Sequence, residues 1–289
     1  MQVSFIGLGI MGLPMAKHIY NKGYLYKVYN RTREKADYFF ERGIDVALSP
    51  KDAAIGADYI ITMVSNSDDV HDVILGKDGV IHHAKKGAVV IDMSSINPEV
   101  SKQIGERLQE KGIRFLDAPV SGGERGAIEG KLAIMVGGEE EVVDDARKVL
   151  QLMGTPVHVG SLGSGGYAKL ANQIMVALHI QAMSEAFTLA KKANLQADQL
   201  FEAIKNGLAG SNVLEQKVSN IQHGVFEPGF KVSLHLKDLN NVLEAADQLD
   251  VQLPFTNEIQ QVMQEMNKQG MGELDHSSLY AYLQKKQEK

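Results

Sequence analysis

Cysteine is absent from the 289-residue sequence. Disulfides, cysteine metal sites and thiol nucleophiles are therefore excluded. Long apolar runs are also lacking. The best candidate for a membrane span, residues 170–184, is interrupted by Asn172, Gln173, His179 and Gln181 and is shorter than the roughly 20 apolar residues that a bilayer requires. The first residues, MQVSFIGLG, have no basic region before their short apolar run, unlike a signal peptide. We expect a cytoplasmic protein without a membrane partner.

A basic surface is not expected either. The formal net charge is −6, whereas a nucleic-acid-binding surface needs a basic stripe. We therefore expect no nucleic-acid partner. The pair His82–His83 has no carboxylates nearby at the spacing of a ligand set, so we expect no metal site. The hydrophobic content of 44% is typical of globular proteins, and the length suits two domains.

Two patterns divide the chain. In the first half, helical patterns such as residues 11–22, 32–42 and 98–111 alternate with the strand candidates QVSFIG, YKVYN, DYIITMV, GAVVIDM, IRFLDAP, LAIMVGG and PVHVG. This alternation predicts a Rossmann-type parallel sheet with helices on both faces, over residues 1–162. The remaining residues, 163–289, have helical patterns and predict an all-α domain. The long helix that joins the two domains, over residues 167–193, is apolar on most faces and is expected to be buried on all sides.

The first strand candidate leads into the glycine pattern FIGLGIMG, with Gly7, Gly9 and Gly12 in G-x-G-x-x-G spacing. The three glycines alone could form a turn without a ligand. Between a strand and a helix they predict a dinucleotide site, in which the helix N-terminus binds the pyrophosphate. The expected cofactor contacts in this loop are Gly7, Leu8, Gly9, Ile10, Met11 and Gly12.

The second strand candidate is followed by Asn30, Arg31, Thr32 and Arg33. Sites selective for NAD commonly have an acidic residue at about this place, which would repel a 2′-phosphate. Arginine and a hydroxyl group would bind that phosphate. We therefore predict NADP(H) as the preferred cofactor, bound by Asn30, Arg31 and Thr32, with NAD(H) as the alternative. The competing interpretation is that the arginines are solvated charges at a helix start.

Later segments are expected to complete the pocket, because ligands bind at the carboxyl ends of parallel strands. The segments TMVSNS and DMSSIN predict cofactor contacts from Met63, Val64, Ser65 and Ser95, although serines before a helix are also common caps. In DAPVSGG, Ser121, Gly122 and Gly123 could present a hydroxyl and successive N–H groups to a substrate carboxylate. By itself this tripeptide could also be a plain turn.

The motifs FIGLGIMGLPMA, DAPVSGG, GSGGYAKLANQ and HLKDL occur in an order and at a spacing that resemble the β-hydroxyacid dehydrogenase family, over residues 3 to about 282. Within this family the chain is most similar to the tartronate semialdehyde reductases. The resemblance implies an NAD(P)-dependent oxidoreductase acting on the CH–OH group of a β-hydroxyacid. It also implies a helical domain that forms homodimers or homotetramers.

Particular residues match the family's site. The resemblance implies a catalytic lysine at Lys169, substrate contacts at Ser121, Gly122 and Gly123, and a lysine, Lys237, that reaches cofactor and substrate. It also implies an amide beside the catalytic lysine. Several relatives have asparagine four residues after the lysine, where this chain has Gln173, and we predict that Asn172 takes the role. The segment NRT, where some tartronate semialdehyde reductases have an aspartate, is a second departure and argues against NAD(H).

The surroundings of Lys169 support a chemical role. No Asp, Glu, Lys or Arg lies between Lys169 and Glu185. Burial disfavours the ammonium form and brings a lysine pKa towards neutrality. Such a lysine can serve as general acid in carbonyl reduction and as general base in the reverse reaction. The histidines are weaker rivals: we expect His179 to be buried on the apolar helix, and we assign no catalytic role to His235 or His276.

The sequence thus predicts the reduction of a short semialdehyde acid, tartronate semialdehyde to glycerate. Alternatives of the same chemistry are a 3-hydroxyisobutyrate dehydrogenase and a glyoxylate or succinic semialdehyde reductase. Ser211 and Asn212 are where a hydroxyl-selective pocket would be sought. A non-catalytic NADP-binding module is an alternative of another class, which the retention of Lys169 disfavours. A 6-phosphogluconate dehydrogenase-like decarboxylase would require a longer chain.

Overall fold

The computed structural model of the chain describes residues 1–287 and divides into two compact units, Met1–Lys169 and one that begins at Leu170. The first unit is built on one sheet with the strand order β3-β2-β1-β4-β5-β6-β8-β7, and β9 pairs with β8. The strands are β1 (Val3–Ile6), β2 (Leu25–Tyr29), β3 (Asp45–Val46), β4 (Tyr59–Thr62), β5 (Val89–Asp92), β6 (Arg114–Asp117), β7 (Val120–Ser121), β8 (Leu132–Gly137) and β9 (Gly154–Gly160).

The first six strands are parallel, which confirms the expected Rossmann-type arrangement. Strand β8 differs, because it pairs antiparallel with both β6 and β7 and parallel with β9. Strands β6 and β7 therefore run in the same direction, with only two residues between them, and the chain reverses in residues 122–131 before it enters β8. The two-residue strands β3 and β7 have no counterpart among the strand candidates.

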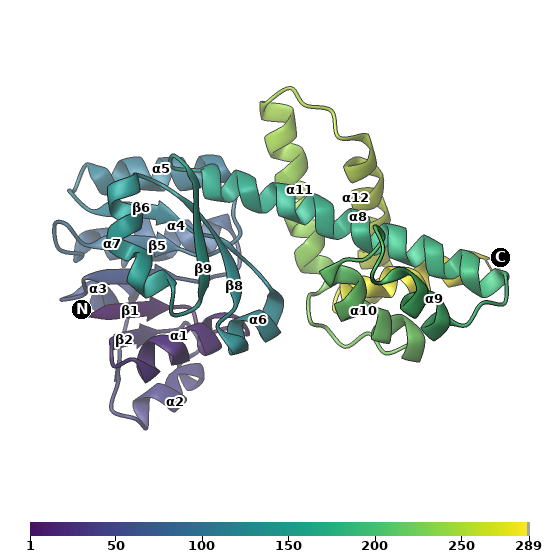
Figure 1. Ribbon diagram of the computed structural model, residues 1–289. Coiled ribbons are helices and arrows are strands. Elements are labelled where there is room, and N and C mark those ends of the chain that lie inside the picture. The colour runs from purple at the N-terminus through teal and green to yellow at the C-terminus, as the bar shows by residue number, and fades with distance from the viewer. Residues whose placement is uncertain (288–289) are drawn as a thin grey trace. The chain divides into compact units, whose positions relative to one another are not determined.

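Helices cover both faces of this sheet (Figure 1). One face packs against α1 (Gly12–Asn21), α2 (Asp37–Phe40), α6 (Gly123–Glu129) and α7 (Glu140–Leu150), and the other against α3 (Pro50–Ala54), α4 (Ser67–Leu75) and α5 (Pro98–Gln109). Strand residues alternate between the two cores: Phe5 lies in one cluster and Ile6 in the other. This is the two-fold alternation expected of a strand buried on both faces. Two 3₁₀ turns, Arg33–Ala36 and Val80–His82, complete the unit.

Side-chain caps define where two of these helices begin. Asn97 accepts a hydrogen bond from the Glu99 N–H (2.9 Å), and Pro98 occupies the first turn of α5. Asn66 accepts one from the Asp69 N–H (2.8 Å) at the start of α4. Each cap satisfies a backbone donor that has no partner within its helix.

The second unit is helical. It contains most of α8 (Ser164–Lys192), then α9 (Ala197–Ile204), α10 (Asn212–His223), α11 (Val232–Gln248), α12 (Pro254–Met266) and α13 (Leu279–Gln287), with single turns at Asn267–Met271 and His276–Ser278. Phe187, Leu239, Met263 and Leu279 lie in its buried core. Helix α8 begins in the first unit and continues into the second, as expected for the joining helix. No helix within residues 1–287 combines the length and apolarity that crossing a membrane requires.

Two expectations about α8 are wrong. It is not buried on all sides: Ala177, Ile180 and Phe187 pack into the core, whereas Met175 is 60% and Leu189 73% exposed. His179, expected to be buried, is also exposed. One side of a helix can be covered by its own unit while the opposite side, equally apolar in sequence, stays uncovered.

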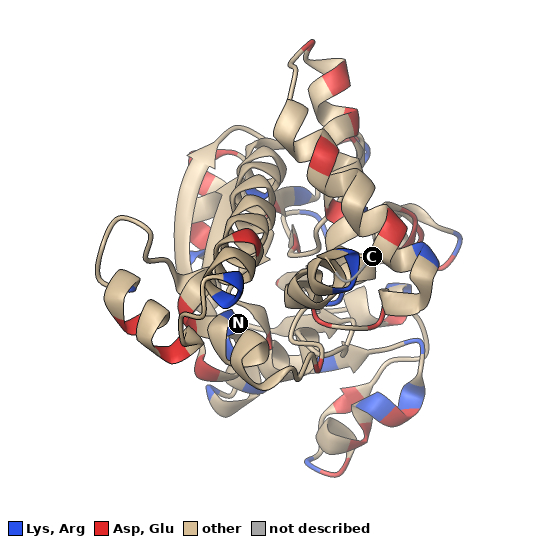
Figure 2. Cartoon of the chain, turned by 90° about the vertical axis from the view of Figure 1, so that its right-hand side faces the viewer, with Lys and Arg blue, Asp and Glu red and all other residues tan. Residues whose placement is uncertain are grey.

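Along the described chain, basic and acidic residues are interspersed (Figure 2).

Candidate active site

The carboxyl ends of five parallel strands of the first unit lie along one edge of the sheet. In register, Ile6 pairs with Tyr29 and Thr62, Thr62 with Asp92, and Asp92 with Asp117. The loops that follow these strands therefore meet at the edge where open parallel sheets bind ligands. The structure places at this edge the predicted cofactor residues Gly7, Leu8, Gly9, Ile10, Met11, Gly12, Asn30, Arg31, Thr32, Met63, Val64, Ser65 and Ser95.

The three glycines of the first loop have different roles. Gly7 has a φ of +100°, and a Cβ atom there would lie 2.2 Å from the Met63 carbonyl oxygen. A Cβ on Gly12 would lie 1.9 Å from the Gly7 carbonyl oxygen, whereas one on Gly9 would meet nothing within 4 Å. Gly7 and Gly12 thus allow the loop to pack, and Gly9 leaves open space. Helix α1 has no acidic residue in its first turn, so its N-terminus suits a phosphate.

Asn30 connects the glycine loop to the segment after β2. Its Oδ1 accepts a hydrogen bond from the Leu8 N–H (2.8 Å), and its Nδ2 donates to the Thr32 carbonyl (2.8 Å). The side chain therefore orders the loop, in addition to any contact with a cofactor. Arg31 is available to a ligand: its side chain is 84% exposed, and its guanidinium makes an ion pair of 3.3 Å with Asp69.

The loops after β4 and β5 are joined by a buried carboxylate that the sequence reasoning missed. Asp92 Oδ1 accepts hydrogen bonds from Thr62 Oγ1 (2.7 Å) and from the Ser94 N–H (3.2 Å). Ser94 Oγ in turn accepts one from the Val64 N–H (2.9 Å). Burial raises the pKa of Asp92 to about 6. The only sequence signal for this carboxylate is an aspartate directly after the apolar run VVI.

Four predicted cofactor residues of these loops remain accessible at the edge: Met63, Val64 and Ser95 are half-buried, and Ser65 is exposed.

The predicted anion nest lies after β6. Ser121 ends β7 and is half-buried, and Gly122 and Gly123 open α6 with φ values of +136° and +63°. Glycine adopts positive φ without steric cost. Two such residues in succession can direct neighbouring N–H groups towards one anion. A Cβ on Gly123 would meet nothing within 4 Å, so space is open there as well. The tripeptide thus has room for a small carboxylate.

Lys169 lies on α8 within the first unit. The helix starts at Ser164, three residues earlier than predicted, so the lysine belongs to the second turn and not the first. Lys169 is 8% exposed and is the only lysine within residues 1–287 that is buried. This agrees with the burial expected from the absence of charged neighbours in sequence.

In the second unit, the other predicted residues are connected through Asp238. Gln173 is buried, and its Nε2 donates to Asp238 Oδ2 (2.6 Å), while Asn172 Nδ2 donates to Gln173 Oε1 (2.9 Å). Lys237 makes an ion pair with Asp238 Oδ1 (3.1 Å). The amide of Gln173 is thus engaged between α8 and α11, whereas Asn172 is only half-buried. Asp238 belongs to the HLKDL motif, but no role was predicted for it.

Two histidines of the second unit are structural. His235 and His276 are buried, with their Nδ1 atoms 2.9 Å apart, and the ring of Phe230 contacts both edge-on. Burial, together with the neighbouring His235, holds the pKa of His276 well below its ordinary value. The adjacent Asp275 accepts hydrogen bonds from Lys217 and from the Gly229 N–H. Within residues 1–287, no three His, Asp or Glu side chains converge as metal ligands would.

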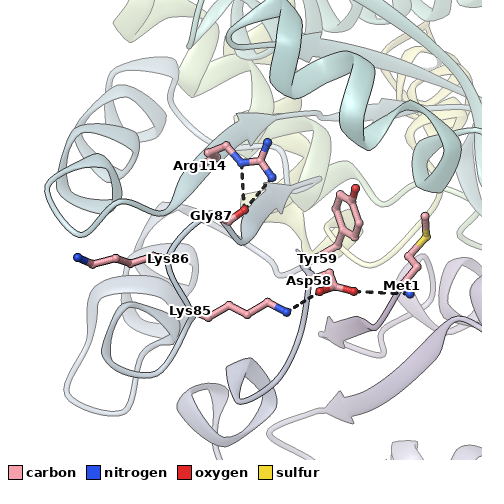
Figure 3. A pocket seen from close by; sticks show the side chains of 7 residues that line it. All are labelled: Met1, Asp58, Tyr59, Lys85, Lys86, Gly87 and Arg114. Carbon is pink, nitrogen blue, oxygen red and sulfur yellow. Dashed lines mark hydrogen bonds and ion pairs between the residues drawn. The ribbon is translucent and has the colours of Figure 1, made fainter.

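A surface pocket of the first unit lies at the other edge of the sheet (Figure 3). It has a volume of about 380 Å³ and includes Tyr59 and Arg114, the first residues of β4 and β6. Two of its cations are engaged: Lys85 pairs with Asp58, and Arg114 donates to the Gly87 carbonyl and pairs with Asp145. Its position at the amino ends of the strands separates it from the glycine loop and from the residues predicted to bind ligands.

Comparison with known proteins agrees with this geometry. Residues 2–163 match the family model described as the NAD binding domain of 6-phosphogluconate dehydrogenase, and residues 163–283 match the NAD-binding domain of NADP-dependent 3-hydroxyisobutyrate dehydrogenase. The chain is 39% identical to 2-hydroxy-3-oxopropionate reductase of Escherichia coli, over 98% of this chain and 97% of that protein. It belongs to the β-hydroxyacid dehydrogenase family.

Other members of this family align over nearly the whole chain. The mitochondrial 3-hydroxyisobutyrate dehydrogenase of mouse is 34% identical, over 99% of this chain and 88% of that protein. The structure of Mycobacterium tuberculosis 3-hydroxyisobutyrate dehydrogenase with L-serine has a TM-score of 0.89 at 29% identity, over 98% of both chains. This β-hydroxyacid dehydrogenase is therefore an NAD(P)-dependent oxidoreductase that acts on CH–OH groups, with a Rossmann-type domain and a helical domain joined by α8.

Proposed function

We propose that this β-hydroxyacid dehydrogenase reduces a short semialdehyde acid with NADPH, converting tartronate semialdehyde to glycerate, with Lys169 as the proton donor. The observation that carries the proposal is the burial of this one lysine near the start of α8. Burying a charged lysine removes its hydration, which costs free energy. A lysine that served only as a surface charge would therefore stay exposed. An amine held out of bulk water suits a group that exchanges a proton with substrate.

The residues of the first unit supply the parts that the reaction requires. NADPH held by the glycine loop and Arg31 would supply the hydride, and negative charge would then develop on the aldehyde oxygen. The Lys169 ammonium stabilises this oxygen and donates the proton that completes the alcohol. Ser121 and the N–H groups of Gly122 and Gly123 hold the substrate carboxylate. The family resemblance adds Asn172 and Lys237 as substrate contacts, and the engagement of the Gln173 amide with Asp238 favours Asn172 over Gln173.

Similarity to the 2-hydroxy-3-oxopropionate reductase of E. coli supports tartronate semialdehyde, which is the same compound under another name. The relatives named 3-hydroxyisobutyrate dehydrogenase support a second candidate substrate, which bears a methyl group in place of the hydroxyl. Ser211 gives little help in the choice, because its Oγ already accepts a hydrogen bond from the Leu214 N–H (3.1 Å) as the cap of α10.

A substrate panel tests the proposal. Tartronate semialdehyde, methylmalonate semialdehyde, succinic semialdehyde and glyoxylate are each assayed with NADPH and NADH by steady-state kinetics. We expect the highest kcat/KM with tartronate semialdehyde, because a site that hydrogen-bonds a hydroxyl discriminates strongly against its absence. A higher kcat/KM for methylmalonate semialdehyde would favour the second candidate. Absence of turnover with all four would contradict the enzymatic proposal and favour a non-catalytic NADP-binding module.

The preference for NADP(H) is supported by Arg31, whose exposed guanidinium follows β2 where an acidic residue would exclude a 2′-phosphate. We expect Arg31→Ala to raise the Kd for NADPH about 10- to 100-fold and to leave that for NADH within about 2-fold, because a charge-assisted contact to phosphate contributes about 1.5–3 kcal/mol. Fluorescence titration of both cofactors measures the two values.

Arg107→Ala is the matched control for this variant, since Arg107 is an exposed arginine of α5 that also pairs with an acid, Glu110. It should change neither Kd. Equal weakening of NADPH and NADH by Arg31→Ala would refute a contact to the 2′-phosphate.

We also propose that residues 163–289 form a substrate and oligomerisation domain, through which two or four copies associate. The uncovered apolar side of α8, with Met175 60% and Leu189 73% exposed, supports this assembly. Exposed apolar side chains that gather on one face of a protein are typical of surfaces that bind another protein chain.

A further inference from the structure

Asp117, the last residue of β6, places a carboxylate at the start of α8. Its Oδ1 accepts a hydrogen bond from the Gly163 N–H (2.8 Å), and its Oδ2 accepts one from the Gly166 N–H (2.8 Å). The side chain is 1% exposed. Both oxygen atoms thus hold backbone groups that lie 46 and 49 residues later in the chain.

The surrounding backbone is shaped around this carboxylate. A Cβ atom on Gly137, the register partner of Asp117, would lie 2.4 Å from Oδ1. A Cβ on Gly165 would lie 2.9 Å from Oδ2 and 2.4 Å from the Met135 carbonyl oxygen. Glycines at these two positions allow strand β8 and the first turn of α8 to approach Asp117 closely. Any larger residue would push the helix away from the sheet.

The first turn of α8 needs such a partner. A helix N-terminus carries N–H groups without intrahelical acceptors and a partial positive charge. Helix α8 has no acidic residue of its own in this turn. Burial raises the pKa of Asp117, and the N–H groups of Gly163 and Gly166 oppose that rise by favouring the carboxylate. The acid is therefore supplied from the sheet, which connects the position of the helix to the end of β6.

We propose that Asp117 is a positioning residue that sets the place of Lys169 relative to the substrate-binding residues. Gly166, which Asp117 holds directly, precedes Lys169 by three residues, or slightly less than one helical turn. Ser121 follows Asp117 by four residues. The Asp117 side chain thus connects the helix that carries the proposed proton donor to the end of β6, from which the chain leads to the proposed anion nest. This inference rests on the proposed role of Lys169.

The test compares Asp117→Asn with Tyr167→Phe. In Asp117→Asn one oxygen still accepts an N–H, but the new NH₂ group faces the other donor, so the first turn should shift. A misplacement of about 1 Å costs roughly 100-fold in rate. We expect kcat, expressed per NADPH-binding site, to fall about 100-fold. KM and the Kd for NADPH should stay within about 2-fold of the wild-type values. Tyr167→Phe removes a different hydrogen bond of the same turn, from Tyr167 Oη to Glu99 (3.0 Å), and should keep kcat within about 3-fold.

A purely structural role predicts different results. Loss of stability alone lowers the number of folded sites, but it leaves kcat per site and the isotope effect unchanged. With deuterated NADPH, a displaced proton donor slows the chemical step, so the primary isotope effect on kcat should rise in Asp117→Asn and not in Tyr167→Phe. Hydrogen exchange of the peptide that covers residues 161–170 should also accelerate in Asp117→Asn, a readout that does not depend on catalysis.

Gly165→Ala tests the same contact from the helix if Asp117→Asn does not fold. Its Cβ would displace the first turn while leaving the carboxylate in place, and we expect the same loss of kcat with normal NADPH binding. Wild-type kcat per site in whichever variant folds would overturn the inference. The proposed function would not be affected by that outcome, provided that the wild type is active and Lys169→Ala is inactive. An inactive wild type would instead contradict the proposed function, and faster exchange in Asp117→Asn would then show only that Asp117 anchors α8.

Discussion

Lys169→Ala is expected to lower kcat for semialdehyde reduction about 1,000-fold while leaving the Kd for NADPH within about 2-fold, since a positioned general acid contributes about 10² to 10⁴ in rate. The alkoxide that forms on hydride transfer would lose the ammonium group that we propose stabilises it and donates its proton. Lys169 is the only buried lysine within residues 1–287, so no second lysine in comparable surroundings can replace it. Single-turnover kinetics with NADPH and the best substrate of the panel measures the chemical step directly.

Lys102→Ala is the matched control. Lys102 also lies close to the start of α8, over the ring of Tyr167, but its side chain is 39% exposed and pairs with Glu99. It should retain nearly the full rate. Lys169→Arg should not restore activity, because guanidinium does not deprotonate in proteins and its fork has a different geometry. If Lys169→Ala kept near-normal kcat, the assignment of the proton donor would be wrong.

Gly12→Ala is expected to remove measurable cofactor binding and to lower the free energy of unfolding by about 3 kcal/mol, the upper end of what overpacking usually costs. The added Cβ would lie 1.9 Å from the Gly7 carbonyl oxygen and 3.1 Å from the Phe5 ring. The loop must move to relieve these clashes, and the helix N-terminus then no longer faces a phosphate in the same place. NADPH titration and urea unfolding measure the two effects.

Gly9→Ala distinguishes an effect on cofactor binding from an effect on the packing of the loop. A Cβ at Gly9 would meet nothing within 4 Å of the protein, and Gly9 is not among the glycines with positive φ. Stability should therefore change by less than about 1 kcal/mol, as where alanine can adopt the native backbone conformation. NADPH affinity should nevertheless fall, because the methyl group would occupy the space in which we propose that the pyrophosphate binds. If Gly9→Ala left cofactor affinity unchanged, the cofactor would approach the loop elsewhere. If Gly12→Ala were as stable as the wild type, the packing role given to Gly12 would be wrong.

Several features of the site follow from local sequence patterns. The spacing of Gly7, Gly9 and Gly12 between a strand and a helix requires only a few neighbouring residues to be recognised. The apolar runs of the sheet strands are equally local. The burial of Lys169 was expected from the fifteen residues that follow it, none of which carries a charge. Local patterns suffice here because backbone geometry and side-chain periodicity are set within one or two turns or a single strand.

Other features depended on contacts between distant residues. Asp117 reaches Gly163 across 46 residues, Leu8 reaches Asn30 across 22, and Gln173 reaches Asp238 across 65. No local pattern distinguishes these polar side chains from solvated ones, because the partner is supplied only when separate elements pack. The same reason explains the errors about α8. Its sequence is apolar on most faces, and whether a given face is covered depends on which helices its own unit places there. The motifs therefore predicted where the chemistry would occur, and only the packed fold revealed which carboxylates and amides contact the predicted site residues and their neighbours.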